Sequence, residues 1–128
     1  MNLQEIEKLK SILTQFVMQG CHMQCIPNQN AALRASGRVV GVGFRPLWSS
    51  PIDSKIEKIE LNYIDQRGTL QPYSLYNVIG YDIVSYDGQN LENSDHIIFD
   101  MHVYSPIKAA SKEPYDKVRL DIRKGSTR

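Results

Sequence analysis

The stretch from Leu75 to Tyr104 constrains the fold more than any other part of the sequence. It reads as two extended segments, LYNVIGYDIVSY and HIIFDMHVY, joined by the polar segment DGQNLENSD. The second segment alternates strictly, because side chains of a strand point to opposite faces in turn. One face carries only apolar residues, namely Ile97, Phe99, Met101 and Val103. The stretch therefore predicts a β-hairpin with one face in a core.

The remainder of the chain adds a helix and more strands. Apolar residues at spacings of three and four predict an amphipathic helix over residues 3–19, with Asn2 as its N-cap, Glu5 completing a capping box and Gly20 at its C-terminal end. Residues 55–65 fit both a helical spacing and an alternation, and the turn Asp65–Gly68 that follows favours a strand. Cys21–Pro27 is a candidate short strand. Further strands are expected at approximately 38–45, 56–65, 69–73, 75–86, 96–104 and 115–123.

These elements predict an α+β fold in one domain, residues 1–128. The helix is expected to pack on a mostly antiparallel β-sheet, a meander of about five or six strands. Pro72 indicates a sheet edge or a break. In RVVGVGFR, alternation places Val40, Val42 and Phe44 on one face and leaves the other face bare at its two glycines.

Charge is segregated along the chain although the net charge is only +1. Residues 8–52 carry five bases and no acid, residues 53–100 nine acids against three bases, and residues 101–128 seven bases against three acids. Segregated basic segments suit an anionic partner or self-association. A net charge this small makes duplex nucleic acid an unlikely partner, since duplex-binding proteins are usually strongly basic.

The two cysteines, Cys21 and Cys25, predict buried free thiols. On a strand their Cα atoms are roughly 13 Å apart, which is too far for a disulfide, and no second cysteine pair completes a zinc site. Free thiols fit a reducing compartment. No signal-peptide pattern and no apolar run of membrane-spanning length is present. We therefore expect a soluble cytoplasmic protein without a membrane partner.

The hairpin holds a His–Asp–His grouping. His96 and His102 are roughly 20 Å apart on an extended strand, so they cannot share one metal ion. His102 can pair with Asp100, at about 7 Å between Cα atoms, or with Asp82 if the register allows. A small metal-dependent or acid–base enzyme built on these residues is therefore one alternative. Motifs of serine hydrolases, phosphate loops and zinc or calcium sites are missing, so no catalytic residue, metal or cofactor is assigned.

The hypothesis that the sequence favours is a non-enzymatic binding protein for an anionic, phosphate-bearing small ligand such as a nucleotide, which it could sequester. Arginines suit phosphates and aromatic rings suit bases. Binding at subunit boundaries of a homo-oligomer is also expected. The other alternative is a protein–protein interaction module, such as an inhibitor, adaptor or assembly subunit, using its helix or a sheet edge. The candidate ligand-binding residues are Arg34, Arg38, Arg45, Trp48, Tyr76, Tyr81, Arg119 and Arg123.

Overall fold

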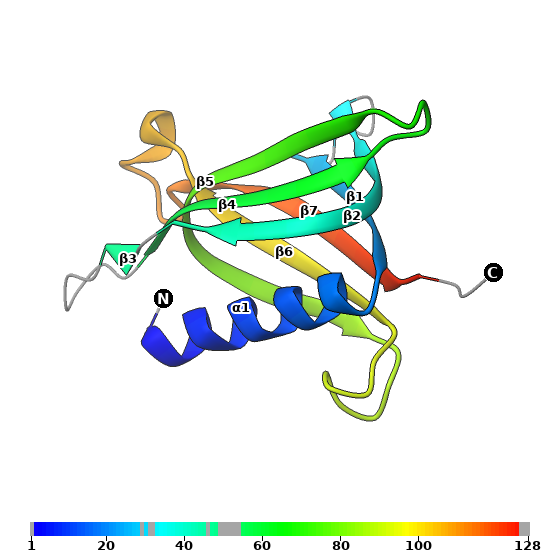
Figure 1. The fold of residues 1–128 in the computed structure, drawn as a ribbon. Coiled ribbons are helices and arrows are strands. Elements are labelled where there is room, and N and C mark those ends of the chain that lie inside the picture. Colours follow the sequence, from blue (N-terminus) through cyan, green and yellow to red (C-terminus); the bar gives the residue numbers. More distant parts are fainter. Residues whose placement is uncertain (1, 29, 31–32, 46, 49–54, 126–128) are drawn as a thin grey trace.

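The structure is a computed structural model, and it describes residues 2–28, 30, 33–45, 47–48 and 55–125 (Figure 1). Within these residues the elements are helix α1 (Leu3–Met18), strands β1 (Cys21–Pro27), β2 (Ala35–Phe44), β3 (Leu47–Trp48), β4 (Lys55–Ile64), β5 (Leu70–Tyr86), β6 (His96–Tyr104) and β7 (Tyr115–Lys124), and the 3-10 helix η2 (Pro106–Lys108). No helix among these residues combines the length and the apolar character needed to cross a bilayer.

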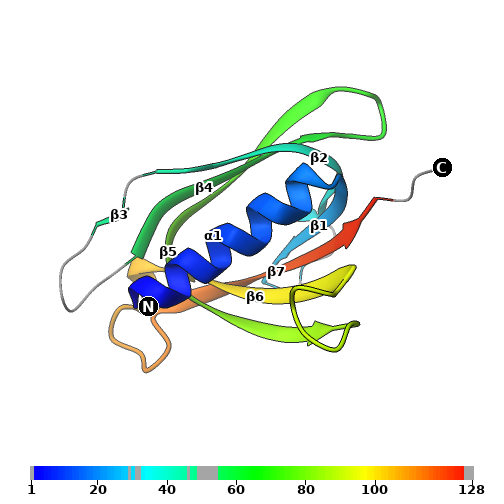
Figure 2. The ribbon, with the colours of Figure 1, turned by 60° about the horizontal axis from the view of Figure 1, so that its bottom comes forward.

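Helix α1 begins and ends as its sequence predicts. The Asn2 side chain accepts a hydrogen bond from the Glu5 backbone N–H at 2.8 Å, and the Glu5 side chain accepts one from the Asn2 backbone N–H. Gly20 follows the helix in the left-handed region, with φ of 77°. The apolar stripe of Ile6, Leu9, Leu13 and Phe16 is buried. The helix lies along β2 and over β7 (Figure 2), so it covers the core as an amphipathic helix should.

The strands are antiparallel, as expected, but they do not form an open meander. Their hydrogen-bonded order is β2-β1-β7-β6-β5-β4-β3, and β2 also pairs with β4. That extra pairing closes the strands of the described chain, apart from the short β3, into a six-stranded barrel (Figure 1). The expected open sheet was wrong because β1 pairs with both β2 and the last strand, β7.

Strand β5 makes the closure possible. It is one strand of 17 residues, where two strands, 69–73 and 75–86, were expected. Its first part pairs with β4 and its second part with β6, and the two pairings meet at Val78. Register shifts beside Val78 and after Ile83 mark bulges, which bend a strand and increase its twist. Pro72 lies in the first part of β5, where β4 is the one neighbour among the described strands. This agrees with the sheet edge that Pro72 indicated in the sequence.

The barrel interior is apolar. Inward residues of three neighbouring strands are nearly inaccessible, namely Cys21, Met23 and Cys25 of β1, Val118, Leu120 and Ile122 of β7, and Ile97, Phe99 and Met101 of β6. Both cysteines are free, as predicted. Burial raises the pKa of Cys21 to about 11 and that of Cys25 to about 12, so both are inert thiols at neutral pH.

In β2, the alternating pattern of the sequence assigned Val39 and Val40 to the wrong faces of the strand. The register with β4 shifts between Val39 and Gly41. Val39 is therefore buried, and Val40, expected on the same face as Val42 and Phe44, is 44% exposed although those two pack against the core. The bulge inserts one residue and reverses the phase of the strand before it.

The predicted hairpin turn after β4 is present. Gly68 has φ of 78°, and the Asp65 carboxylate accepts hydrogen bonds from the backbone N–H groups of Arg67 and Thr69 at 2.9 and 3.0 Å. The bond from Thr69 is the main cause that lowers the pKa of Asp65.

Candidate functional site

Four basic side chains form one line across the outside of the barrel. In the strand register, Arg38 of β2 lies directly opposite His22 of β1, and His22 lies opposite Arg123 of β7. Arg123 in turn lies opposite His96 of β6. Residues directly opposite on antiparallel strands share a face and have Cα atoms about 5 Å apart. The Cα atoms of Arg38 and Arg123 are therefore about 10 Å apart. We call these four residues the arginine–histidine row.

The row exists because β1 alternates cleanly. Cys21, Met23 and Cys25 are drawn into the core, which forces His22 and Gln24 outward into solvent. The sequence of β1, CHMQCIP, contains no acidic residue. No carboxylate therefore lies on the strand between the two arginines.

Charge compensation along the row is uneven. The His96 Nε2 atom lies 2.8 Å from the Asp121 carboxylate, and the Arg123 Nε atom lies 3.6 Å from the same carboxylate. The Arg123 side chain remains 65% exposed. Within the described part of the chain, Arg38 and His22 form no ion pair. Positive charge is therefore least compensated at the β2–β1 end of the row.

A shallow hollow of about 340 Å³ adjoins that end. It lies between the start of β2 and the β4–β5 turn and is lined by Arg34, Ala35, Ser36, Tyr63, Asp65, Gln66 and Arg67. Ser36 precedes Arg38 by two residues and therefore shares its face of β2. Burial is the main cause that raises the pKa of Tyr63, so its phenol stays neutral and can donate a hydrogen bond. The hollow offers two guanidinium groups, a hydroxyl, a phenol and an amide, together with the Asp65 carboxylate.

The structure brings some of the predicted ligand-binding residues together. Arg34, Arg38 and Arg123 lie on the connected surface of the hollow and the row. Arg119 lies on the same face of β7 as Arg123. Its guanidinium is held by both carboxylate oxygens of Asp100, at 3.0 and 3.2 Å.

The other candidates lie elsewhere. Arg45 follows the far end of β2, where its backbone N–H donates to the Lys58 carbonyl. Tyr76 is exposed, with the Lys58 ammonium 5.6 Å from its ring centre. Tyr81 donates its hydroxyl proton to the Glu5 carbonyl at 2.8 Å, so its ring packs beneath α1. Trp48 belongs to β3, and its side chain lies outside the described residues.

The residues considered for acid–base chemistry separate into two pairs. His102 Nε2 lies 3.0 Å from the Asp82 carboxylate, and the His102 ring stacks on Tyr115 with centroids 4.0 Å apart. Asp100 is bound to Arg119 instead of His102, so the Asp100–His102 pair considered from the sequence does not form. No three metal-ligating side chains among His, Cys, Asp and Glu gather anywhere in the residues described.

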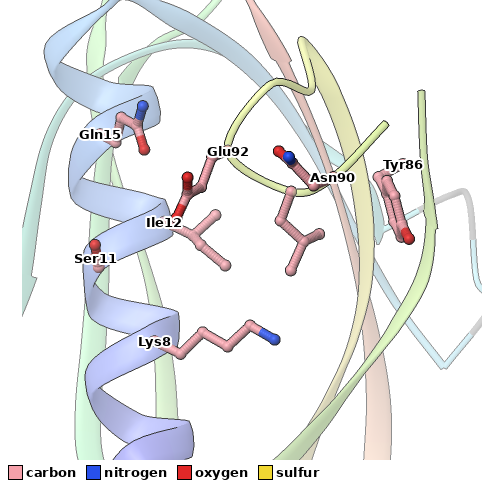
Figure 3. A pocket seen from close by; sticks show the side chains of 8 residues that line it. Lys8, Ser11, Ile12, Gln15, Tyr86, Asn90 and Glu92 are labelled. Carbon is pink, nitrogen blue, oxygen red and sulfur yellow. The ribbon is translucent and has the colours of Figure 1, made fainter. Parts of the chain in front are cut away.

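Sequence reasoning missed a second hollow, a groove of about 630 Å³ between α1 and the β5–β6 loop (Figure 3). Its walls are Lys8, Ser11, Ile12 and Gln15 of α1 and Tyr86, Asn90, Leu91 and Glu92 of β5 and the loop. No predicted ligand-binding residue lines it. Its position depends on how the loop folds back toward α1, which no local pattern signals. His22 was also missed as a site residue.

A scan of protein-family models and searches of curated proteins and of solved structures found no match.

Proposed function

We propose that the protein is a non-enzymatic binding protein for a small phosphate-bearing anion, such as a nucleotide, held at the arginine–histidine row. One observation carries the proposal: Arg38 and Arg123 flank His22 on an exposed strand face, and the strand between them has no acid. Guanidinium groups bind phosphate oxygens through two parallel hydrogen bonds. Two arginines about 10 Å apart at Cα can converge on one phosphate group.

The adjoining hollow supports a nucleotide over a bare phosphate. Arg34, Arg67 and Tyr63 line it, and guanidinium planes and phenol rings are surfaces on which bases stack. The Ser36 hydroxyl lies between the hollow and Arg38, where it can bond a sugar or phosphate oxygen. A ligand in this pose places its base in the hollow and its phosphate on the row.

The test is isothermal titration of the full chain with a panel of nucleotides and with inorganic phosphate, at low and high salt. Arg38→Gln and Arg123→Gln are expected to weaken binding about tenfold or more each, since a hydrogen bond to a charged group contributes about 1.5–3 kcal/mol. High salt is expected to weaken binding by the wild type, because both arginines are exposed.

Arg45→Gln is the matched control. It removes the same charge from the same part of the chain, about 23 Å from Arg38 along an extended strand, and is expected to leave affinity unchanged. Failure of every anion to bind, or an equal loss in Arg45→Gln, would reject the proposal. The homo-oligomer and the protein–protein module remain predictions, which native mass spectrometry of the purified protein addresses directly.

A further inference from the structure

We infer that anion binding at the arginine–histidine row is coupled to the uptake of one proton by His22, so that the row binds phosphate-like anions more tightly in mild acid than in mild alkali. The inference deepens the proposed function and rests on it, because it concerns the same surface. It assigns His22 as the group through which proton concentration regulates that binding.

The coupling follows from the position of His22. Its cross-strand neighbours are Arg38 on one side and Arg123 on the other. An anion that bridges the two arginines, whose Cα atoms are about 10 Å apart, would therefore lie against His22. An anion in this position favours the protonated form of His22, because imidazolium donates two N–H bonds and attracts negative charge. By thermodynamic linkage, if the bound anion increases the affinity of His22 for a proton, a proton on His22 increases the affinity of the row for the anion by the same factor.

Apart from the two arginines, one charged residue, Asp121, lies at a neighbouring strand position of His22 among the described residues. Its neighbour on its own face of β1 is Gln24, and the diagonal position on β2 is Ser36. The diagonal position on β7 is Asp121, whose carboxylate lies 2.8 Å from His96 and 3.6 Å from Arg123. His22 thus faces two arginines closely and one carboxylate that already has two partners.

His96 is the weaker candidate for the same role. It also neighbours Arg123, but its Nε2 atom already lies 2.8 Å from the Asp121 carboxylate, which would balance a proton there without an anion. The Asp87 carboxylate accepts hydrogen bonds from the backbone N–H groups of Asp95 and His96, and so adds a second negative charge near His96. A charge that the protein itself balances responds less to an arriving anion. Protonation of His22, which has no such acid, is therefore the step that anion binding promotes.

The experiment uses sulfate as the probe, because sulfate stays doubly charged across the range where histidine titrates, whereas phosphate esters gain a proton near pH 6. The full chain is titrated with sulfate at low ionic strength at about pH 5.5 and about pH 8, and binding is followed by NMR shifts. Affinity is expected to be about tenfold higher at the lower pH. The C–H resonances of the His22 ring are expected to move toward the imidazolium position as sulfate binds.

Three variants assign the effect. His22→Gln is expected to remove the pH dependence, and because His22 is exposed the variant is expected to keep the wild-type melting temperature. His102→Gln is the matched control. His102 lies outside the arginine–histidine row, with its Nε2 atom 3.0 Å from the Asp82 carboxylate, so this variant is expected to retain the pH dependence. His96→Gln is also expected to retain it, and loss of the effect in His96→Gln alone would overturn the assignment to His22.

The two proposals fail in different ways. Equal sulfate affinity at both pH values, no sulfate binding at the lower pH, or an unchanged pH dependence in His22→Gln overturns proton coupling. Nucleotide binding at the higher pH that depends on Arg38 and Arg123 would still support the proposed function. Absence of nucleotide and phosphate binding at both pH values overturns both.

Discussion

Gly37 is the residue at which the barrel tolerates no side chain. It lies in β2 opposite Met23 of β1, and a Cβ atom there would come 2.3 Å from the Ile64 carbonyl oxygen and 2.7 Å from the Tyr63 ring. The carbonyl belongs to the backbone of β4, so it cannot rotate away. A residue without a side chain therefore lets β2 approach the end of β4 closely enough to close the barrel.

We predict that Gly37→Ala lowers the free energy of unfolding by about 1–3 kcal/mol, the usual cost of overpacking a tight site. Urea unfolding followed by circular dichroism measures the change. Gly43→Ala is the matched control in the same strand, where a Cβ atom meets nothing within 4 Å, and its change is expected to stay within about 0.5 kcal/mol. Equal effects at the two positions would contradict the structure.

Single residues were predictable from sequence where a local rule decides them. The Asn2–Glu5 capping box and the turn at Gly68 both depend on neighbours within a few residues. The faces of Val39 and Val40 were assigned wrongly because a bulge depends on the partner strand β4, which alternation in β2 does not reveal.

Helix α1 is joined to the barrel by a specific bond as well as by apolar packing. The Tyr81 hydroxyl donates to the Glu5 carbonyl at 2.8 Å, and the Tyr81 ring packs edge-on against Phe99, with centroids 6.1 Å apart. The bond connects the first turn of α1 to the second part of β5. Tyr81 thus has a structural role in the fold, and its stacking role in ligand binding stays a prediction.

We predict that Tyr81→Phe destabilises the fold by about 1 kcal/mol, because it removes one hydrogen bond and leaves the ring in place. Thermal unfolding by calorimetry measures this loss. Tyr76→Phe removes a hydroxyl from an exposed tyrosine and is expected to leave the melting temperature unchanged. Weaker anion binding in Tyr81→Phe at full stability would restore Tyr81 to the ligand site.

At the scale of elements, periodicity located α1 and the strands but not their continuity. Because Pro72 indicated an edge or a break, two strands, 69–73 and 75–86, were expected where the structure has β5. In the structure one strand serves two neighbours, since β4 is its partner before Val78 and β6 its partner after it. A proline ends a strand only where its missing N–H is needed, and that is decided by the partner.

At the scale of the whole molecule, the closure of the strands into a barrel could not be predicted from the sequence. Alternation shows that a segment is a strand with a buried face, but it does not show which distant strand lies beside it. The pairings of β1 with β7 and of β2 with β4 are of this kind. The candidate site shares this limit, because Arg123 lies beside His22, and so near Arg38, only through the pairing of β1 with β7.

We predict that Cys21 and Cys25 react with a thiol reagent only when the whole barrel opens. Both side chains are at most 1% exposed, and burial raises the pKa of each thiol above 10. At high reagent concentration the labelling rate should equal the unfolding rate extrapolated from denaturant kinetics. Rapid labelling of Cys21 in the native protein would show that β1 opens locally.

The position of β1 between β2 and β7 also sets the order in which the molecule can be completed. β2 follows β1 closely in the chain and can pair with it early, whereas the other edge of β1 stays without its partner until Tyr115–Lys124 has been synthesised. Pairings between segments this distant form slowly, because they close a large loop. The arginine–histidine row takes one residue from each of β2, β1, β7 and β6, so the proposed anion site is complete only after β1 has paired with β7. Anion binding would then distinguish finished molecules from nascent ones.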